Sequence, residues 1–182
     1  MKKNLLTLTL LCLTGIAFAQ ETKKDTVQIS KGDNEIRLNL LNTIIGIPEI
    51  TYERLFKDNS GAGLSVLVGI DDNTDYKFGV IPYYRIYFGN SLKKGTGFFI
   101  EANTTIMQVK DHRIYLTDIN GYTHSYRDEN VTNFGLGAAA GGKFLTKNGF
   151  VGEIYLGVGR FFNKNSYVEA YPRVGITIGK RF

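Results

Sequence analysis

The chain has 182 residues, of which 22 are Lys or Arg and 17 are Asp or Glu, giving a formal net charge of +5. Its length suits one domain, and so small a positive excess, spread along the chain, argues against a nucleic-acid partner. The sequence contains 21 Gly, 11 Tyr and 12 Phe but only 3 Pro, a composition that favours β-strands.

The first 19 residues have the layout of a secretory signal peptide. Lys2 and Lys3 form a basic start, residues 5–19 are apolar, and the stretch closes on Ala-Phe-Ala, the small-x-small pattern that signal peptidase recognises. The apolar stretch is shorter than the roughly 20 residues of a membrane-spanning helix. We therefore predict cleavage after Ala19. A lipid anchor at Cys12 is disfavoured because Leu11, which precedes it, is not small.

Cleavage leaves a mature chain without cysteine, because Cys12 is the only one. Removal of Lys2 and Lys3 leaves 20 basic and 17 acidic residues, a net charge of +3. Residues 20–34 are polar and charged, and we expect them to form a loosely held N-terminal tail. Residues 35–182 are predicted to form one β-barrel domain.

This domain divides into about eight segments in which polar and apolar residues alternate, separated by turn signals. Most segments reach the roughly 9–11 residues that a membrane-crossing strand needs. No mature segment is apolar over the length of a spanning helix, so a membrane-spanning form must be a closed barrel. The predicted fold is an antiparallel, up-and-down transmembrane β-barrel, with strands at residues 35–45, 49–56, 62–70, 76–88, 96–108, 131–145, 150–162 and 167–182.

The connections near Asp58, Ser91 and Lys147 are short and would be periplasmic if the N-terminus is periplasmic. Those near Asn73, Asn120 and Lys164 would then face outward, and one of them is long, whereas the first outward turn, at Gly46, is unusually short. Short periplasmic turns and long outer loops are typical of outer-membrane barrels. The longest irregular stretch, residues 110–130, is charged and contains both His residues, and we expect it to be an outer loop.

Charged residues fall on one face of six predicted strands. If the apolar face of each strand points outward, these charges point inward, where they can neutralise one another. A charge that faced lipid at mid-membrane would instead cost about 2–4 kcal/mol for Arg or Lys. The alternative is a soluble barrel or sandwich whose apolar face is the core. The predicted interior network consists of Glu53, Arg85, Glu101, Lys143, Glu153 and Arg173.

Eight strands enclose a space that side chains can just fill. Tyr83, Tyr87, Phe99 and Tyr155 are expected to help block it, and the many glycines of the inward face make room there. An open pore is therefore not expected. Aromatic residues near the strand ends are candidates for interfacial girdles, namely Tyr52, Phe56, Tyr84, Phe88, Phe144 and Phe162.

Residues 34–182 resemble the small eight-stranded outer-membrane barrels, the group that includes OmpX and the OmpA membrane domain. The resemblance rests on the segments ITYERLF, GFFIEAN and GLGAAAGGKF and on Phe182, which follows the alternating Val174, Ile176 and Ile178. It looks most similar to the uncharacterised "outer membrane protein beta-barrel domain" and domain-of-unknown-function families. The resemblance implies the outer membrane of a Gram-negative bacterium, contact with its lipid, and a monomer. It also implies that periplasmic chaperones and the barrel-assembly machinery, which would read Phe182, act during biogenesis.

The predicted function is non-enzymatic: envelope structure, or surface interaction through the outer loops. One alternative is a lipid-modifying enzyme using His112, His124 and Ser125. Adjacent His124 and Ser125 would point to opposite sides of an extended segment, whereas a catalytic base must lie beside its nucleophile. Another is a soluble, lipocalin-like periplasmic barrel that binds a small apolar ligand. We predict no cofactor or metal, because the sequence lacks phosphate-loop, paired-His and dinucleotide motifs.

Overall fold

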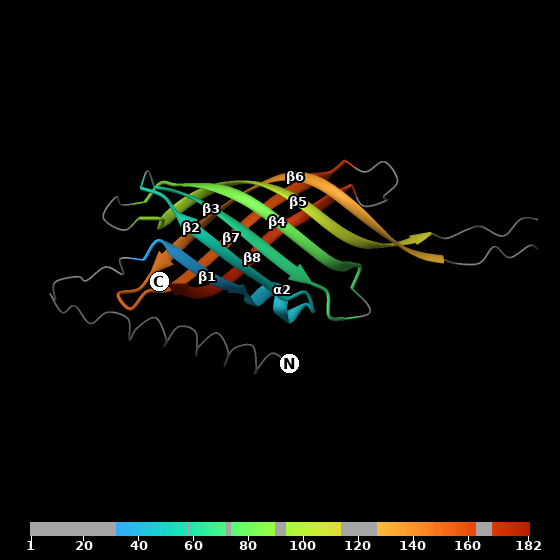
Figure 1. Ribbon diagram of the computed structural model, residues 1–182, viewed down its shortest axis with the longest axis horizontal. Coiled ribbons are helices and arrows are strands. Elements are labelled where there is room, and N and C mark those ends of the chain that lie inside the picture. Colours follow the sequence, from blue (N-terminus) through green and yellow to red (C-terminus); the bar gives the residue numbers. More distant parts are fainter. Residues whose placement is uncertain (1–31, 58, 72–73, 90–93, 114–126, 163–168) are drawn as a thin grey trace, which may run out of the picture.

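The computed structural model describes residues 32–57, 59–71, 74–89, 94–113, 127–162 and 169–182. Within these ranges the chain is a closed barrel of eight antiparallel strands, each paired with its neighbours in sequence and the last with the first (Figure 1). This confirms the predicted all-β, up-and-down barrel of eight strands. The predicted signal peptide, with its cleavage position Ala19, and most of the N-terminal tail lie outside the described residues.

Strand boundaries follow the alternation of polar and apolar residues within a few positions, except at β1, β5 and β6. The elements are β1 (Asn34–Asn39), α2 (Leu40–Ile44), β2 (Glu49–Leu55), β3 (Ser60–Val68), β4 (Tyr76–Tyr87), β5 (Gly97–Arg113), β6 (Arg127–Leu145), β7 (Phe150–Phe161) and β8 (Ala170–Arg181).

The first predicted strand is wrong in its second half. β1 ends at Asn39, and residues 40–44 form the helix α2. Asn39 caps this helix, because its side-chain oxygen accepts a hydrogen bond from the backbone N–H of Asn42 at 3.3 Å. Asparagine is a preferred N-cap residue. The chain therefore leaves the sheet after only 6 strand residues.

The predicted outer loop at residues 110–130 is also corrected at both ends. β5 runs on to Arg113 and β6 begins at Arg127, and the two pair continuously from Gly97↔Lys143 to Arg113↔Arg127. They are the longest strands, with 17 and 19 residues, and they project past the rest of the wall (Figure 1). The backbone of His112 lies in β5, whereas His124 and Ser125 lie outside the described residues.

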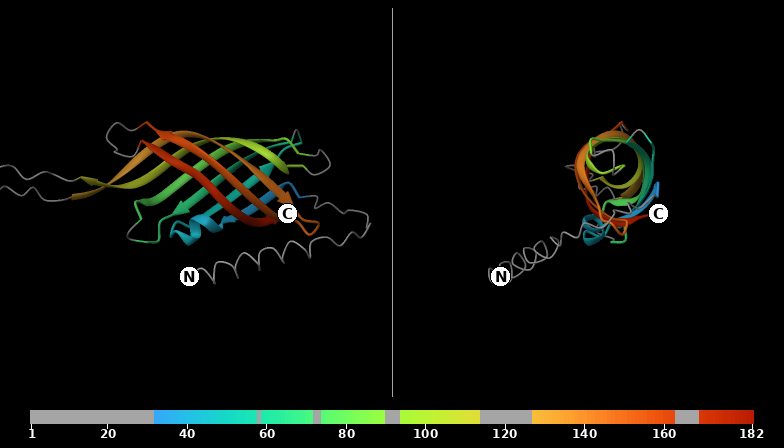
Figure 2. Two further views of the ribbon diagram at one scale, coloured as in Figure 1. Left: turned by 180° about the vertical axis from the view of Figure 1, so that it is seen from behind. Right: turned by 90° about the vertical axis from the view of Figure 1, so that its left-hand side faces the viewer.

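The barrel closes where β1 pairs with β8, from Glu35↔Arg181 to Asn39↔Thr177. At this seam the Phe182 N–H donates to Asn34 O at 2.9 Å and the Asn34 N–H donates to Phe182 O at 3.2 Å. The closed cross-section is visible along the barrel axis (Figure 2, right). We call the end at which Asn34 and Phe182 lie the terminal end, and the end at which α2 lies the helix end.

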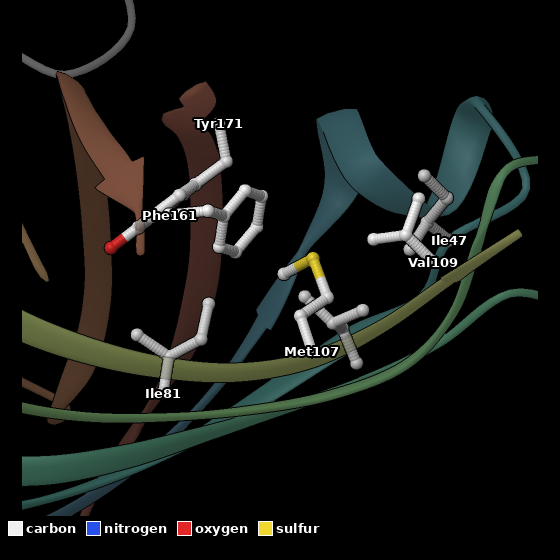
Figure 3. Close-up of a cluster of buried hydrophobic side chains, with 7 residues drawn as sticks. Ile47, Ile81, Met107, Val109, Phe161 and Tyr171 are labelled. Atoms are coloured by element: carbon white, nitrogen blue, oxygen red, sulfur yellow. The ribbon is translucent and has the colours of Figure 1, made fainter. Parts of the chain in front are cut away.

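Two apolar clusters lie inside the barrel. Near the helix end, one cluster contains Ile47, Ile81, Met107 and Val109 together with Phe161 and Tyr171, whose rings are tilted by 37° with centroids 4.9 Å apart (Figure 3). Nearer the terminal end, the second cluster consists of Leu55, Tyr87, Phe99, Ala139 and Tyr155. None of the helices in the described ranges is both long enough and apolar enough to cross a bilayer.

Candidate functional site

Among the residues that the structure describes, the interior of the barrel carries ten buried charged side chains. Strand geometry puts successive side chains on opposite faces, so alternate residues of one strand share the interior. Five carboxylates and five cations result, each at most 3% exposed, and their formal charges cancel. They are Glu35, Glu49, Glu53, Glu101, Glu153, Arg37, Arg85, Lys143, Arg173 and Arg181.

All six residues of the predicted network lie in this group. The structure brings them together through direct ion pairs, with no member left outside the network. The prediction omitted Glu35, Arg37, Glu49 and Arg181. Glu35 and Arg37 alternate with the outward apolar residue Ile36, so the pattern that indicated the other six was present there too, whereas Arg181 follows the outward charge of Lys180.

Glu53 is the centre of the terminal half of the network. Its Oε2 accepts from Arg37 Nη2 at 2.6 Å and Lys143 Nζ at 3.0 Å, and Arg85 Nη1 lies at 3.4 Å. The hydroxyl of Tyr83 donates to the same oxygen at 3.0 Å, and that of Tyr87 donates to Glu53 Oε1. A buried carboxylate needs such partners, because an unpaired one would be strongly destabilising.

Arg85 joins this half to the rest. Its Nη1 donates to Glu153 at 2.7 Å and its Nη2 contacts Glu101 at 2.6 Å. The same guanidinium lies over the Phe99 ring at 4.2 Å and over the Tyr83 ring at 4.5 Å. With Glu53, Arg85 thus contacts three carboxylates as well as these two aromatic faces, which fixes its position in the barrel.

The chain of pairs continues toward both ends. Arg173 Nε donates to Glu101 at 3.0 Å, and its Nη1 donates to Glu49 at 2.5 Å. At the terminal end, Arg181 Nη2 pairs with Glu35 at 2.5 Å, and Lys143 Nζ donates to Glu35 at 2.9 Å. The ten charges therefore form one connected network that spans most of the barrel length.

Inward glycines make the room for the interior rings. A Cβ added at Gly63 would overlap the Tyr83 ring, one at Gly159 would overlap the Tyr171 ring, and one at Gly175 would meet the Tyr155 ring. Tyr83, Tyr87, Phe99 and Tyr155 are all buried. Charged and aromatic side chains therefore occupy the interior, as expected for eight strands.

The outer surface has the opposite character. On β7, Ile154, Leu156 and Val158 are 59%, 71% and 63% exposed, whereas Glu153 between Gly152 and Ile154 is 2% exposed. The outward residues of β8 continue this surface with Ile176 and Ile178. The candidate girdle residues Tyr52, Phe56, Tyr84, Phe88, Phe144 and Phe162 are all exposed on this side.

The described part of the terminal end carries an ion pair that lies outside the strands. The Lys94 ammonium hydrogen-bonds Asp33 at 2.6 Å, and their side chains are 25% and 49% exposed. This bond lowers the pKa of Asp33 below its ordinary value, against a small opposing effect of burial. Phe182, the predicted assembly signal, is also at this end and is 57% exposed.

The buried charges of the interior neutralise one another. Each buried carboxylate is held by cations or hydroxyls of other strands. Over the described ranges, no three His, Cys, Asp or Glu residues are grouped so as to hold a metal ion. No family model matches the chain, and neither a curated protein nor a solved structure matches it. Membership of the OmpX and OmpA group stays a prediction.

Proposed function

We propose that this chain is an integral outer-membrane β-barrel protein with a non-enzymatic role in the envelope. The observation that carries the proposal is the reversed polarity of the wall: ten charges of the described residues lie inside, whereas the outward strand residues are mainly apolar, with the exposed charges Arg54, Arg160 and Lys180 toward the strand ends. In water, burial of apolar area is the main force that drives folding, so an apolar exterior needs an apolar surrounding. A lipid bilayer supplies it.

Barrel closure supports the same proposal. Within a bilayer every backbone N–H and C=O needs a partner inside the protein, which only helices and closed barrels provide. Here every strand has two paired neighbours, including β1 with β8. Chaperones, the barrel-assembly machinery and a monomeric state belong to this proposal as expectations.

The lipocalin-like alternative is less well supported. Such a barrel needs an apolar interior to receive its ligand, whereas a ligand here would meet Glu53, Arg85 and the other buried charges. The enzyme alternative depends on His112, His124 and Ser125, whose side chains lie outside the described residues. We therefore favour a role in envelope structure, or in surface interaction through the projecting β5–β6 hairpin.

The first test is the location of the protein. After expression of the full chain in a Gram-negative host, we expect it in the membrane fraction after a carbonate wash. On a gel, the unheated protein should migrate differently from the boiled protein, because a lipid-embedded barrel stays folded in detergent. Recovery in the soluble periplasmic fraction without detergent would contradict the proposal.

The second test asks whether the barrel folds without the projecting part of the β5–β6 hairpin. Deletion of residues 111–128 removes the projecting part of the hairpin and retains the register from Gly97↔Lys143 to Val109↔Val131, which Lys110, Glu129 and Asn130 then connect as a three-residue loop. We expect the shortened protein to remain in the membrane and to keep its heat-modifiable migration. Loss of folding would show that the projection is structural, which would contradict its assignment to surface interaction.

A further inference from the structure

The strand wall is too short at β1 and β2 to cross a membrane by itself. β1 has 6 residues and β2 has 7. At about 3.4 Å per residue a strand of 6 covers about 20 Å, and a tilt of about 40° reduces its height further. The apolar band of an outer-membrane barrel is about 25 Å tall. Something other than strand must complete the wall at this place.

The helix α2 lies where β1 would have continued. It begins directly after Asn39 and packs beside β8, and the side chain of Asn39 donates from Nδ2 to Val174 O at 3.1 Å. Figure 1 shows α2 at the rim away from Phe182. Beyond Val174, β8 keeps an exposed, uncharged residue on its outer face at Pro172. The apolar surface thus continues past the point where β1 ends.

The helix has the same reversed polarity as the strands. Ile44, its last residue, and Ile45, its C-cap, are 83% and 54% exposed. Its polar residue Asn42 turns toward the interior and donates to Glu49 Oε2 at 2.7 Å. The exposed Thr43 donates its hydroxyl hydrogen to Asn39 O at 2.7 Å. The outward side of α2 therefore presents apolar side chains and a hydroxyl that already has a partner.

The backbone after α2 is also paired, as a segment in lipid requires. The carbonyls of Leu41, Asn42 and Thr43 accept from the N–H groups of Ile45, Ile47 and Gly46 at 3.3, 2.8 and 3.2 Å. Gly46 O accepts from the Ile70 N–H at 2.9 Å. This bond brings Ile70, which is 70% exposed, beside the same turn.

Taking the proposed function as given, we infer that α2 is part of the lipid-contacting wall, with Ile44, Ile45 and Ile70 inserted among the acyl chains of the adjacent leaflet. The occupant of this surface is lipid, because the surface is continuous with the apolar exterior of β8 and fills the height that β1 and β2 lack. A short helix with one apolar side at the membrane boundary gains stability from the area it buries.

Tryptophan fluorescence tests this directly, because the chain contains no Trp. Full-length variants Ile44→Trp, Ile45→Trp, Leu156→Trp and Lys147→Trp are reconstituted separately in phosphatidylcholine vesicles, with or without bromine on the acyl chains. Leu156 is on the outer wall and Lys147 is in an exposed turn, so they report lipid and water respectively. Gel migration without heating verifies that each variant is folded.

We expect Ile44→Trp and Ile45→Trp to lose most of their emission in brominated vesicles, more strongly with bromine near the headgroup end than near the methyl end of the chains. Leu156→Trp should also be quenched, and Lys147→Trp should not. If Leu156→Trp is quenched while both α2 variants behave like Lys147→Trp, α2 is in water and the inference is overturned, although the proposed function survives. If Leu156→Trp is unquenched as well, both are overturned.

Discussion

The two faces of β7 show how one strand serves two surroundings. Its inward side carries Glu153 and Tyr155, both buried in the charged interior, whereas its outward side carries the exposed Ile154 and Leu156. In an ordinary soluble barrel these positions would be exchanged. The comparison teaches that paired charges stabilise the interior, whereas the stability of the apolar exterior depends on the solvent or lipid around it. Inward and outward substitutions should therefore respond to different forces.

The largest effect is expected inside. Removal of one partner from a buried ion pair costs about 3–5 kcal/mol, because the other charge stays buried without compensation. Arg85→Ala or Glu101→Ala should lower the free energy of unfolding by that amount, as measured by urea unfolding in lipid vesicles. The matched control is Arg54→Ala, which removes an exposed Arg from β2 and should change stability by less than about 1 kcal/mol. Equal stabilities for all three variants would refute an energetic role for the network.

A charge on the outer face should cost somewhat less. Leu156→Arg is expected to destabilise the barrel in lipid by about 2–4 kcal/mol, if Leu156 lies near the middle of the bilayer. Asn148→Arg places the same charge in an exposed turn and serves as the control. Unfolding curves of both variants in vesicles give the difference. A neutral or stabilising Leu156→Arg would indicate that the outer face meets water.

Crowding inside the barrel gives a third contrast, again within β7. A Cβ at Gly159 would overlap the Tyr171 ring, whereas a Cβ at Gly152, which faces outward, meets nothing within 4 Å. Gly159→Ala should therefore destabilise the barrel by about 1–3 kcal/mol through overpacking, and Gly152→Ala should have little effect. In a Tyr171→Ala background the penalty of Gly159→Ala should disappear, and its persistence there would contradict the assigned clash.

The smallest effect is expected at the exposed pair of Asp33 and Lys94. The hydrogen bond from Lys94 lowers the pKa of Asp33 in the folded protein, so the stabilisation is present above the unfolded pKa of about 3.9. It is lost as the pH falls through the lower folded pKa. Asp33→Asn should cost at most about 1 kcal/mol at neutral pH. Below the folded pKa the two proteins should unfold at the same urea concentration; a difference that persisted there would have another cause.

Alternation alone was sufficient to predict the barrel and much of its interior. In a strand the period is two, so apolar residues at Ile154 and Leu156 imply that Glu153 and Tyr155 share the other face. The same reasoning applied to β1 would have added Glu35 and Arg37 to the network. The pairing of particular charges could not be predicted, because it depends on barrel closure and on how strands far apart in sequence face one another.

The helix and the projecting hairpin were missed for different reasons. At residues 40–45 the apolar positions follow helical rather than strand spacing, and Asn39 precedes them as a cap. This local pattern indicates a helix, but the prediction instead extended the alternation of polar and apolar residues that precedes it. At Lys110 and Arg127 the sequence has no apolar alternation, because the hairpin there projects past the barrel. Its extension rests on backbone pairing between β5 and β6, which side-chain pattern does not encode.

The seam between β1 and β8 has a consequence for the order of folding. Hairpins such as β7–β8 join neighbours in sequence, but the seam bonds Arg181 to Glu35, 146 residues away. Contacts at such separation form slowly, because a long loop must close before they contribute. Glu35 also forms an ion pair with Lys143. Pairing of β1 with β8 therefore closes the sheet and completes the interior ion pairs in the same step. Before that event the open sheet exposes interior charges that the closed barrel shields, so the proposed insertion into a membrane would depend on closure of the sheet.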